Sequence, residues 1–216
     1  MPSAFCSFTV IIVMAKTITT IFTDLGGVLL TNGWSRTSRA EAIQFFGLDA
    51  EDTEERHHLT FDTYEVGKIT LDDYLNRVIF FKDRSFTRED FRAFMYSRTQ
   101  PYDDMIALVK QLKAQHKLRI AVVSNEGREL AEYRIRQFKL HDFVDFFIVS
   151  SFVHFRKPDV DIFKVALDTA QVDPSEVLYL EDRPMFVQVA ETLGIKGLHH
   201  IDYMSTVEVL KQINFS

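Results

Sequence analysis

The sequence predicts an α/β fold, a doubly wound parallel sheet with a small helical bundle inserted after its first strand. From residue 101 onwards, short apolar runs alternate with segments of helical periodicity, which is typical of a parallel sheet with helices on both faces. Residues 34–98 show helical periodicity and contain no convincing strand. We therefore expect an N-terminal extension (1–16), a core made of residues 17–33 and 99–216, and a helical insert over residues 34–98.

The composition is ordinary for a globular protein, with 46% hydrophobic and 26% charged residues among 216. The net charge of −6 argues against nucleic acid or an anionic membrane as a partner. The single cysteine excludes an internal disulfide and fits a reducing, cytoplasmic compartment. Residues 5–13 are apolar but too short to span a bilayer, and they lack the basic flank of a signal peptide. We expect an extension that the fold does not need, with an extra strand or an anchor as the alternative.

The first predicted strand leads up to a single acid. Residues 17–23 are rich in Ile, Thr and Phe, and they stop at Asp24, which is followed by Gly26 and Gly27. An acid at the carboxyl end of a strand lies where open parallel sheets bind ligands. The glycines allow the backbone to turn sharply and to approach whatever Asp24 binds. Taken alone, an Asp before glycines is more often just a turn residue.

The insert and the rest of the core show clear helix signals. In the insert, a helix is expected to stop at Gly47, and Thr70 and Thr87 each precede an acid by three residues, as in capped helix starts. In the core, short apolar runs alternate with apolar residues at helical spacing. We expect strands over residues 118–123, 146–149, 177–180 and 195–199, and helices around residues 105–112, 127–138, 163–170 and 186–193.

Polar residues follow the ends of the predicted strands, and Lys157 is expected to open the helix between the third and fourth strands. Each has a structural explanation on its own, since serine and asparagine cap helices and lysine is common on surfaces. Parallel strands, however, bring their carboxyl ends to one edge of the sheet. We therefore predict a single site made of Asp24, Ser124, Asn125, Lys157, Glu181 and Asp182.

Four short motifs in this order resemble those of a known family. They are DLGGV starting at residue 24, VVSN ending at 125, RKPD starting at 156 and LED ending at 182. Together they resemble the four motifs of the haloacid dehalogenase superfamily, and EVGKIT in the insert resembles part of that family's helical cap. The resemblance covers most of the chain and implies a Rossmann-like catalytic core beneath a cap.

The resemblance implies an Mg²⁺-dependent phosphohydrolase that acts on a small soluble phosphate ester, such as a sugar phosphate. Asp24 would attack phosphorus and form an aspartyl-phosphate, which water then hydrolyses. Ser124, Asn125 and Lys157 would hold the phosphoryl oxygens, and Lys157 would also orient Asp24. The sequence does not indicate the oligomeric state.

The resemblance also implies a metal site. Mg²⁺ prefers oxygen ligands, and Asp24, the Gly26 carbonyl and Asp182 would supply them, with Glu181 bound to the ion or just behind its ligands. Carboxylates this close would repel one another without a cation. The Glu181–Asp182 pair also argues against dehalogenation, the family's metal-free chemistry.

One position departs from the family pattern. The family's phosphatases carry a second Asp, two residues after the nucleophile, which protonates the leaving group, and Gly26 stands there. A general acid contributes about 10²–10⁴-fold. Three hypotheses stay open: a substrate with a good leaving group, a proton from water or from a cap residue such as Glu65, His57 or His58, or a site that binds phosphate without turnover. The last describes a catalytically weak or inactive regulatory protein.

The cap would determine which substrate is accepted. Trp34 and Glu65 are the cap residues that we expect near the substrate. Trp34 could equally pack inside the insert, since it lies just past the first turn.

Overall fold

The computed structural model describes residues 17–215, so the predicted N-terminal extension lies outside the described residues. The fold is built on a five-stranded, all-parallel sheet in the order β3-β2-β1-β4-β5. The first strand is central, and the chain changes direction across the sheet on either side of it, as in doubly wound folds. The strands are β1 (Thr20–Thr23), β2 (Arg119–Ser124), β3 (Phe146–Val149), β4 (Val177–Glu181) and β5 (Lys196–His199).

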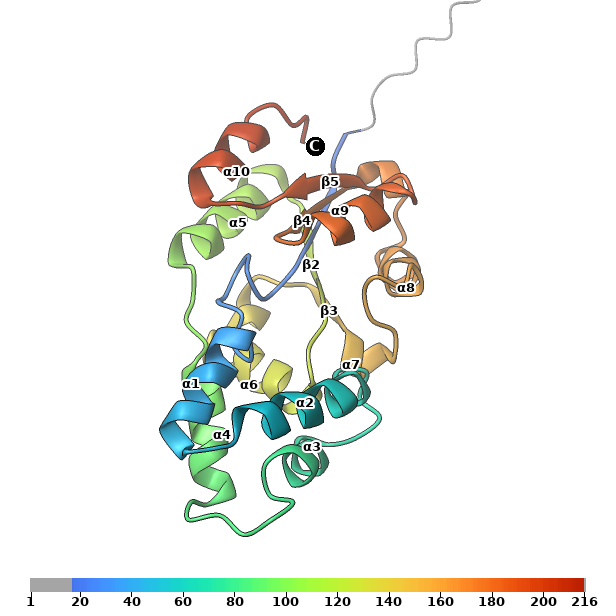
Figure 1. The fold of residues 1–216 in the computed structure, drawn as a ribbon. Coiled ribbons are helices and arrows are strands. Elements are labelled where there is room, and N and C mark those ends of the chain that lie inside the picture. Colours follow the sequence, from blue (N-terminus) through green and yellow to red (C-terminus); the bar gives the residue numbers. More distant parts are fainter. Residues whose placement is uncertain (1–16, 216) are drawn as a thin grey trace, which may run out of the picture.

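The sheet separates two hydrophobic clusters because successive strand side chains point to opposite faces. Ile21 belongs to the cluster on one face and Phe22 to the cluster on the other, and both are fully buried. The first face is covered by α5 (Asp103–His116) and α10 (Tyr203–Leu210), and the second by α8 (Asp161–Ala170) and α9 (Pro184–Glu191) (Figure 1). The predicted doubly wound α/β fold is confirmed.

Four helices occupy the insert between β1 and α5. They gather at one end of the molecule, opposite the end where the C-terminus lies (Figure 1). A third hydrophobic cluster holds them together, and Leu130 of α6 in the core contributes to it. The helices of the insert are α1 (Arg36–Phe46), α2 (Ala50–Glu65), α3 (Leu71–Val78) and α4 (Arg88–Ser97).

The helix ends in the insert follow the local sequence signals. Gly47 ends α1 in a left-handed conformation with φ of 62°. Thr70 and Thr87 both form reciprocal capping boxes with the acid three residues later. Helix α2 was not predicted, since its sequence has few apolar residues and a weak helical pattern; its first turn is capped by Asp49.

Four further elements connect the core: α6 (Arg128–Gln137), α7 (Ser150–Val153) and two short 3₁₀ turns at Leu140–Asp142 and Pro174–Glu176. The prediction that Lys157 opens a helix is wrong. The helix begins four residues later, at Asp161. Proline disfavours helical geometry in the residue before it, and Lys157 lies in a turn that the Asp159 N–H closes onto the Arg156 carbonyl at 2.9 Å.

The insert touches the core at two glycines. A side chain at Gly67, which follows α2, would overlap the Ser151 carbonyl oxygen of the core, and the φ of Gly67 is +72°. Conversely, a side chain at Gly127, just before α6, would overlap the ring of Tyr64 in α2. At Gly67 the two backbones lie close together, and at Gly127 the backbone lies against the Tyr64 ring. These contacts hold the last turn of α2 against the core.

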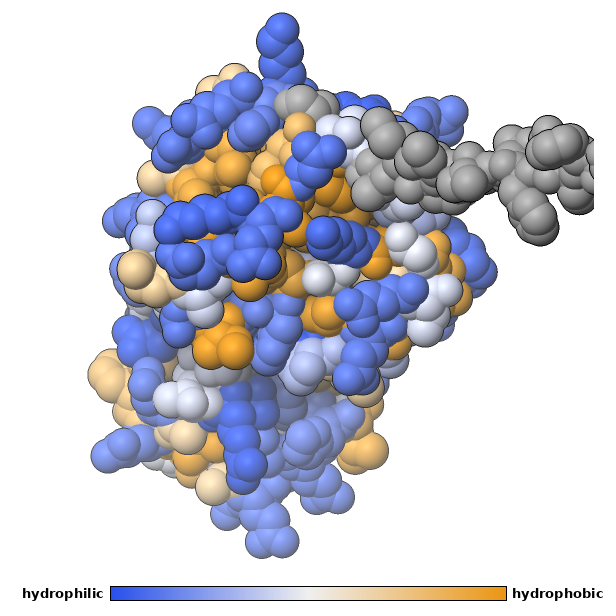
Figure 2. Space-filling model, turned by 90° about the horizontal axis from the view of Figure 1, so that it is seen from above, coloured by the Kyte–Doolittle hydropathy of each residue, from blue (hydrophilic) through white to orange (hydrophobic). Residues whose placement is uncertain are grey.

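Figure 2 shows the end of the molecule remote from the insert, where hydrophobic residues appear in patches between hydrophilic ones. Within residues 17–215, none of the helices has the length and apolar character needed to cross a bilayer.

Candidate active site

The ends of β1, β2 and β4 bring the predicted residues to one edge of the sheet. The strands are in register, with Thr23 of β1 opposite Val122 of β2 and Leu180 of β4. Asp24 continues this alignment, since its backbone N–H donates to the Leu180 carbonyl at 2.8 Å. One oxygen from each of Asp24, Glu181 and Asp182 lies within 4.8 Å of the others.

Lys157 lies at the centre of the buried charges. Its Nζ is 3.1 Å from Asp24 Oδ1 and 2.6 Å from Glu181 Oε2, and it donates to the Tyr179 hydroxyl at 2.9 Å. Burial alone would lower the pKa of Lys157, but the charges of Asp24 and Glu181 outweigh it, so the pKa is raised. The ammonium group therefore stays charged beside the predicted nucleophile.

The acids of this edge differ in how many partners they have. Both Glu181 oxygens are occupied, Oε1 by the Arg183 N–H at 3.0 Å and Oε2 by Lys157 and Tyr179. In contrast, Asp182 Oδ1 is buried without a hydrogen-bond partner among the described residues, and Asp24 Oδ1 has only its ion pair with Lys157 at 3.1 Å. Burial raises the pKa of Asp24, against the opposing effect of Lys157.

These two oxygens fit a divalent cation, because a buried carboxylate oxygen without a hydrogen bond is costly and a hard cation prefers oxygen ligands. Asp24 and Asp182 match the predicted ligand set. Glu181 holds Lys157 instead, so the geometry favours a place for it behind the ligands rather than on the ion.

Asn125 and Ser124 hydrogen-bond different partners. The Asn125 side chain donates to the Lys157 carbonyl and accepts from the Lys157 N–H, both at 2.8 Å. Both ends of its amide therefore hold the Lys157 loop, and the second Nδ2–H remains as a donor for a phosphate. The Ser124 hydroxyl hydrogen-bonds Asp24 and lowers the pKa of that acid.

Gly26 faces a neighbouring side chain. A Cβ built there would lie 2.6 Å from Asn32 Oδ1, while Asn32 Nδ2 donates to Asp182 Oδ2 at 3.4 Å. The φ of Gly26 is not positive, in contrast to that of Gly27 at 84°. Asn32 thus occupies the space into which a second acid would extend.

The insert contributes one buried acid to the site. Glu65, at the end of α2, is 7% exposed, and its Oε2 lies 2.8 Å from Arg156 Nη2. That pair lacks hydrogen-bond geometry, so Oε2 has no hydrogen-bond partner within the described chain. Arg156 also pairs with Asp62, which is exposed. Burial raises the pKa of Glu65, and Arg156 opposes this effect.

The other predicted cap residues have structural partners. Trp34 is buried in the cluster of the insert, and its Nε1 donates to the Tyr74 hydroxyl at 2.9 Å. His57 Nδ1 lies 2.9 Å from the same hydroxyl, and burial lowers its pKa to about 4. His57 is therefore neutral at neutral pH. His58 is exposed, with its Nε2 3.9 Å from Glu54.

The sequence did not single out Glu126 or Arg134. Arg134 is 1% exposed, and it pairs with Glu126 and donates to Thr31 and Thr99, where the chain enters and leaves the insert. Burial raises the pKa of Glu126 to about 7 despite this pairing. The position of Glu126, directly after the predicted Ser124–Asn125 pair, was the available signal.

Two connected cavities lie at this edge. A small cavity of about 50 Å³ is lined by Asp24, Lys157, Glu65 and Glu126, among others. A second cavity of about 450 Å³, which we call the insert-side cavity, shares Glu65 and Glu126 with it and extends to Trp34. The small cavity fits a phosphoryl group at Asp24, and the insert-side cavity offers room for the rest of a substrate.

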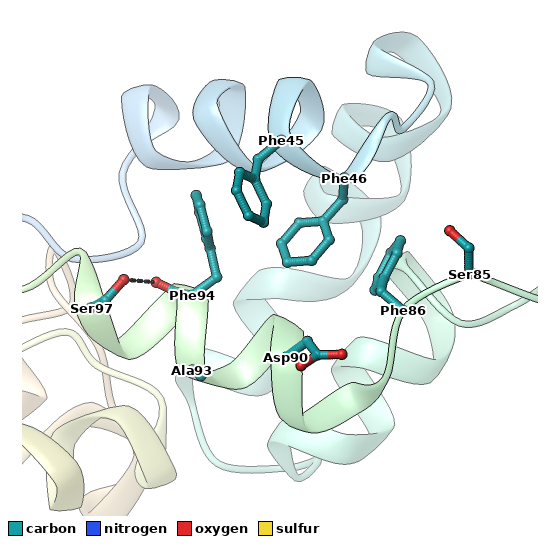
Figure 3. A pocket seen from close by; sticks show the side chains of 8 residues that line it. All are labelled: Phe45, Phe46, Ser85, Phe86, Asp90, Ala93, Phe94 and Ser97. Atoms are coloured by element: carbon teal, nitrogen blue, oxygen red, sulfur yellow. Dashed lines mark hydrogen bonds between the residues drawn. The ribbon is translucent and has the colours of Figure 1, made fainter.

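A third cavity, of about 610 Å³, lies in the insert and contains none of the predicted residues. Figure 3 shows Phe45, Phe46, Phe86 and Phe94 around it. Its acid, Asp90, is used in the capping box of α4, and Ser97 donates to the Phe94 carbonyl. This cavity therefore has no group suited to catalysis.

Comparison with known proteins agrees with this geometry. The family pattern of haloacid dehalogenase-like hydrolases matches residues 18–194. A sesquiterpene phosphatase of Aspergillus oryzae is 23% identical over 206 residues, which is 93% of this chain and 98% of the relative.

The fold is also similar to solved structures. A haloacid dehalogenase family enzyme from Bacteroides thetaiotaomicron matches with a TM-score of 0.73 and 22% identity, over 85% of this chain and 94% of that one. Its complex with magnesium and inorganic phosphate matches with a TM-score of 0.71 and 22% identity, over 84% and 93% of the two chains. Since the family pattern spans most of the sequence and the fold agrees with it, the chain belongs to the haloacid dehalogenase-like hydrolases.

Proposed function

We propose that this hydrolase is an Mg²⁺-dependent phosphatase for a small phosphate ester, acting through an aspartyl-phosphate on Asp24. One observation carries the proposal: Asp24 lies at the end of β1 in a buried ion pair with Lys157, with one carboxylate oxygen lacking a hydrogen-bond partner among the described residues. A buried carboxylate beside a fixed cation is suited to attack an anionic phosphoryl group, because the cation offsets the repulsion.

Each residue of the site has a separate role in this reaction. Asp24 attacks phosphorus while Lys157 and Ser124 compensate charge on the carboxylate and the phosphoryl oxygens. Asn125 keeps the Lys157 loop in place through its two hydrogen bonds. Glu181 and Tyr179 hold the Lys157 ammonium group in position.

Asp24 and Asp182, with the Gly26 carbonyl, would hold Mg²⁺, which supplies charge neutralisation on the phosphoryl oxygens when it is bound. The buried oxygens Asp24 Oδ1 and Asp182 Oδ1 support this assignment. The magnesium and phosphate found in the Bacteroides thetaiotaomicron enzyme are consistent with it.

The insert-side cavity favours a polar leaving group. Apart from Gly33, only Trp34, Phe61 and Leu130 among its lining residues are apolar. Its lining includes five arginines, of which Arg36 and Arg183 have no ion pair within the described residues. A sugar phosphate therefore suits this cavity better than the apolar terpenoid that the name of the Aspergillus relative implies.

Phosphate release tests the proposal. We expect Mg²⁺-dependent turnover in a panel containing a sugar monophosphate, a sugar bisphosphate, p-nitrophenyl phosphate and a terpenyl phosphate. Asp24→Asn should lower turnover by roughly 10⁴-fold or more, since it removes the nucleophile. Its fold should be unchanged, because Asn is nearly the same size.

A different outcome would favour the alternative. No turnover across the panel, with phosphate or vanadate still bound, would indicate a regulatory phosphate-binding protein. Chloride or fluoride release from a haloacid without Mg²⁺ would indicate dehalogenation.

A further inference from the structure

The missing acid at position 26 leaves a question about the leaving-group proton. An alkoxide leaves poorly, and a positioned acid contributes about 10²–10⁴-fold. The small cavity next to Asp24 is lined by only two other acids among the described residues, Glu65 and Glu126. Asn32 fills the space beside Gly26 and carries no acidic proton.

Glu126 is held by a structural charge pair. Its carboxylate contacts Arg134, which is buried and has no other acidic partner in the described chain. The other Arg134 hydrogen bonds go to neutral oxygens of Thr31 and Thr99. Protonating Glu126 would leave a buried guanidinium unpaired, which is strongly destabilising. Although burial raises the pKa of Glu126 to about 7, Glu126 can therefore take up a proton only by giving up its pair with Arg134.

Glu65 has the opposite arrangement. Its cation, Arg156, contacts two carboxylates, Glu65 and Asp62. Asp62 is exposed, with 75% of its side chain accessible, and it is a second acidic partner of Arg156. Glu65 can then carry the proton without leaving any buried charge alone, and its Oε2 is free of hydrogen bonds to the described residues.

The charged groups around Glu65 act in both directions. Burial is the largest effect and raises the pKa of Glu65; Asp62 raises it further, whereas Arg156, Arg183 and Lys157 lower it. Glu126, across the cavity, also repels its charge. The net direction is upward, so the acid form persists to higher pH than in an ordinary glutamate.

The location of Glu65 is also suitable. It comes from the insert, whereas Asp24 comes from the sheet edge, and Glu65 lines both the small cavity and the insert-side cavity. An in-line reaction sends the leaving oxygen away from Asp24. The Glu65 backbone is fixed to the core, since its carbonyl accepts from Ser150 Oγ at 2.6 Å.

We propose that Glu65 is the general acid and base of this enzyme, replacing the acid that is absent at Gly26. This inference rests on the proposed phosphatase function. As the Asp24 oxygen bonds to phosphorus and the bond to the leaving oxygen breaks, the Glu65 carboxyl gives its proton to that oxygen, and the alcohol departs. The Glu65 carboxylate then takes a proton from water, whose oxygen bonds to phosphorus as the bond to Asp24 breaks. Hydrogen phosphate leaves, and both acids return to their starting forms.

The test is Glu65→Gln, assayed at saturating Mg²⁺ with two substrates. An alkyl phosphate such as a sugar 6-phosphate has a poor leaving group and needs the proton, whereas p-nitrophenyl phosphate does not. We expect kcat/KM, which reports formation of the aspartyl-phosphate, to fall by about 10²-fold or more for the alkyl substrate and to change less than about threefold for the aryl substrate. Glu55→Gln is the matched control, because Glu55 is an exposed acid of the same helix outside both cavities.

The pH profile gives a second readout. In the wild type, alkyl turnover should fall on the alkaline side as Glu65 loses its proton, and Glu65→Gln should lose this limb. Glu65→Asp, which keeps the acid but shortens its reach, should keep the limb at reduced turnover.

Other outcomes would overturn the inference. Equal loss on both substrates, or no loss on either, means that Glu65 is not the proton donor. If Glu65→Gln does not fold, a wild-type rate that depends steeply on leaving-group pKa would exclude a working acid. Aryl turnover that depends on Asp24 keeps the phosphatase function in every one of these cases, so the two failures are distinguishable.

Discussion

Arg156 and Lys157 are consecutive residues whose side chains enter two different groups of acids. Lys157 is 1% exposed and lies between Asp24 and Glu181 of the core. Arg156 is partly exposed and lies between Asp62 and Glu65 of the insert. Each cation faces two carboxylates, yet the surroundings of the two groups differ.

The difference determines where a proton can move. On the core side, all three charged groups are buried, and loss of the Lys157 proton would leave two buried carboxylates without a cation. On the insert side, Asp62 reaches water, so Arg156 keeps a second acidic partner when Glu65 carries a proton. The core side is suited to hold a fixed charge, and the insert side is suited to exchange a proton.

Breaking the core side should have the largest effect. Lys157→Met leaves Asp24 and Glu181 buried without a cation. We expect turnover of alkyl and aryl phosphates alike to fall by about 10²-fold or more, and the free energy of unfolding to fall by about 3–5 kcal/mol. Steady-state kinetics and urea unfolding measure the two effects.

The control for this change is the double variant Lys157→Met/Glu181→Gln. It removes one of the two unpaired charges, so it should recover part of the stability but none of the turnover. Wild-type turnover in either variant would show that Lys157 is a structural residue only.

On the insert side, substitutions of the two neighbours of Glu65 should move its pKa in opposite directions. Arg156→Gln removes a cation that lowers the pKa of Glu65, so that pKa should rise. Asp62→Asn removes a like charge, so the pKa should fall. Because the protonated form is the active acid, the alkaline limb of alkyl turnover should move up in Arg156→Gln and down in Asp62→Asn.

Arg156 has two effects: it lowers the pKa of Glu65, and it lines the cavity and so can affect kcat directly. Only the effect on the pKa moves the alkaline limb along the pH axis, so the position of the limb separates the two. Limbs that stay in place, or that move in the same direction, would rule out Glu65 as the group that titrates.

The smallest effect is expected from placing an acid at position 26, where the family's phosphatases carry one. Gly26→Asp requires Asn32 to move, so it is combined with Asn32→Ala. In the wild-type background, alkyl turnover should change by less than about threefold, whereas in Glu65→Gln it should recover by about tenfold, the lower part of what an acid supplies. Asn32→Ala alone is the control, and no recovery in the Glu65→Gln background would argue against a lost proton donor.

The fold was predictable because local and tertiary signals agree. The strands are short apolar runs buried on both faces, and they stop at polar residues such as Asp24 and Ser124. Thr70 and Thr87 predicted helix starts from hydrogen bonds within four residues. Helix α2 is capped by Asp49 but lacks a clear apolar stripe, so its sequence did not predict it.

The sequence predicted which residues lie at the strand ends. It did not predict which side chains form ion pairs or hydrogen bonds with one another there. Parallel strands brought Asp24 close to Glu181, as expected. The sequence could not predict that Lys157 binds Glu181, or that Asn125 binds the Lys157 backbone. Both contacts depend on side-chain geometry between segments far apart in the sequence. The charge pair of Arg134 and Glu126 was missed for the same reason.

The two glycine contacts between the insert and the core have an evolutionary consequence. Gly67 and Gly127 lie outside both cavities, and they set the position of Tyr64 and, with it, that of Glu65. Selection for a new substrate acts on cavity side chains such as Arg36 and Phe61. Those positions can diverge freely while the glycines stay under constraint, so substrate preference can change without moving the proton donor.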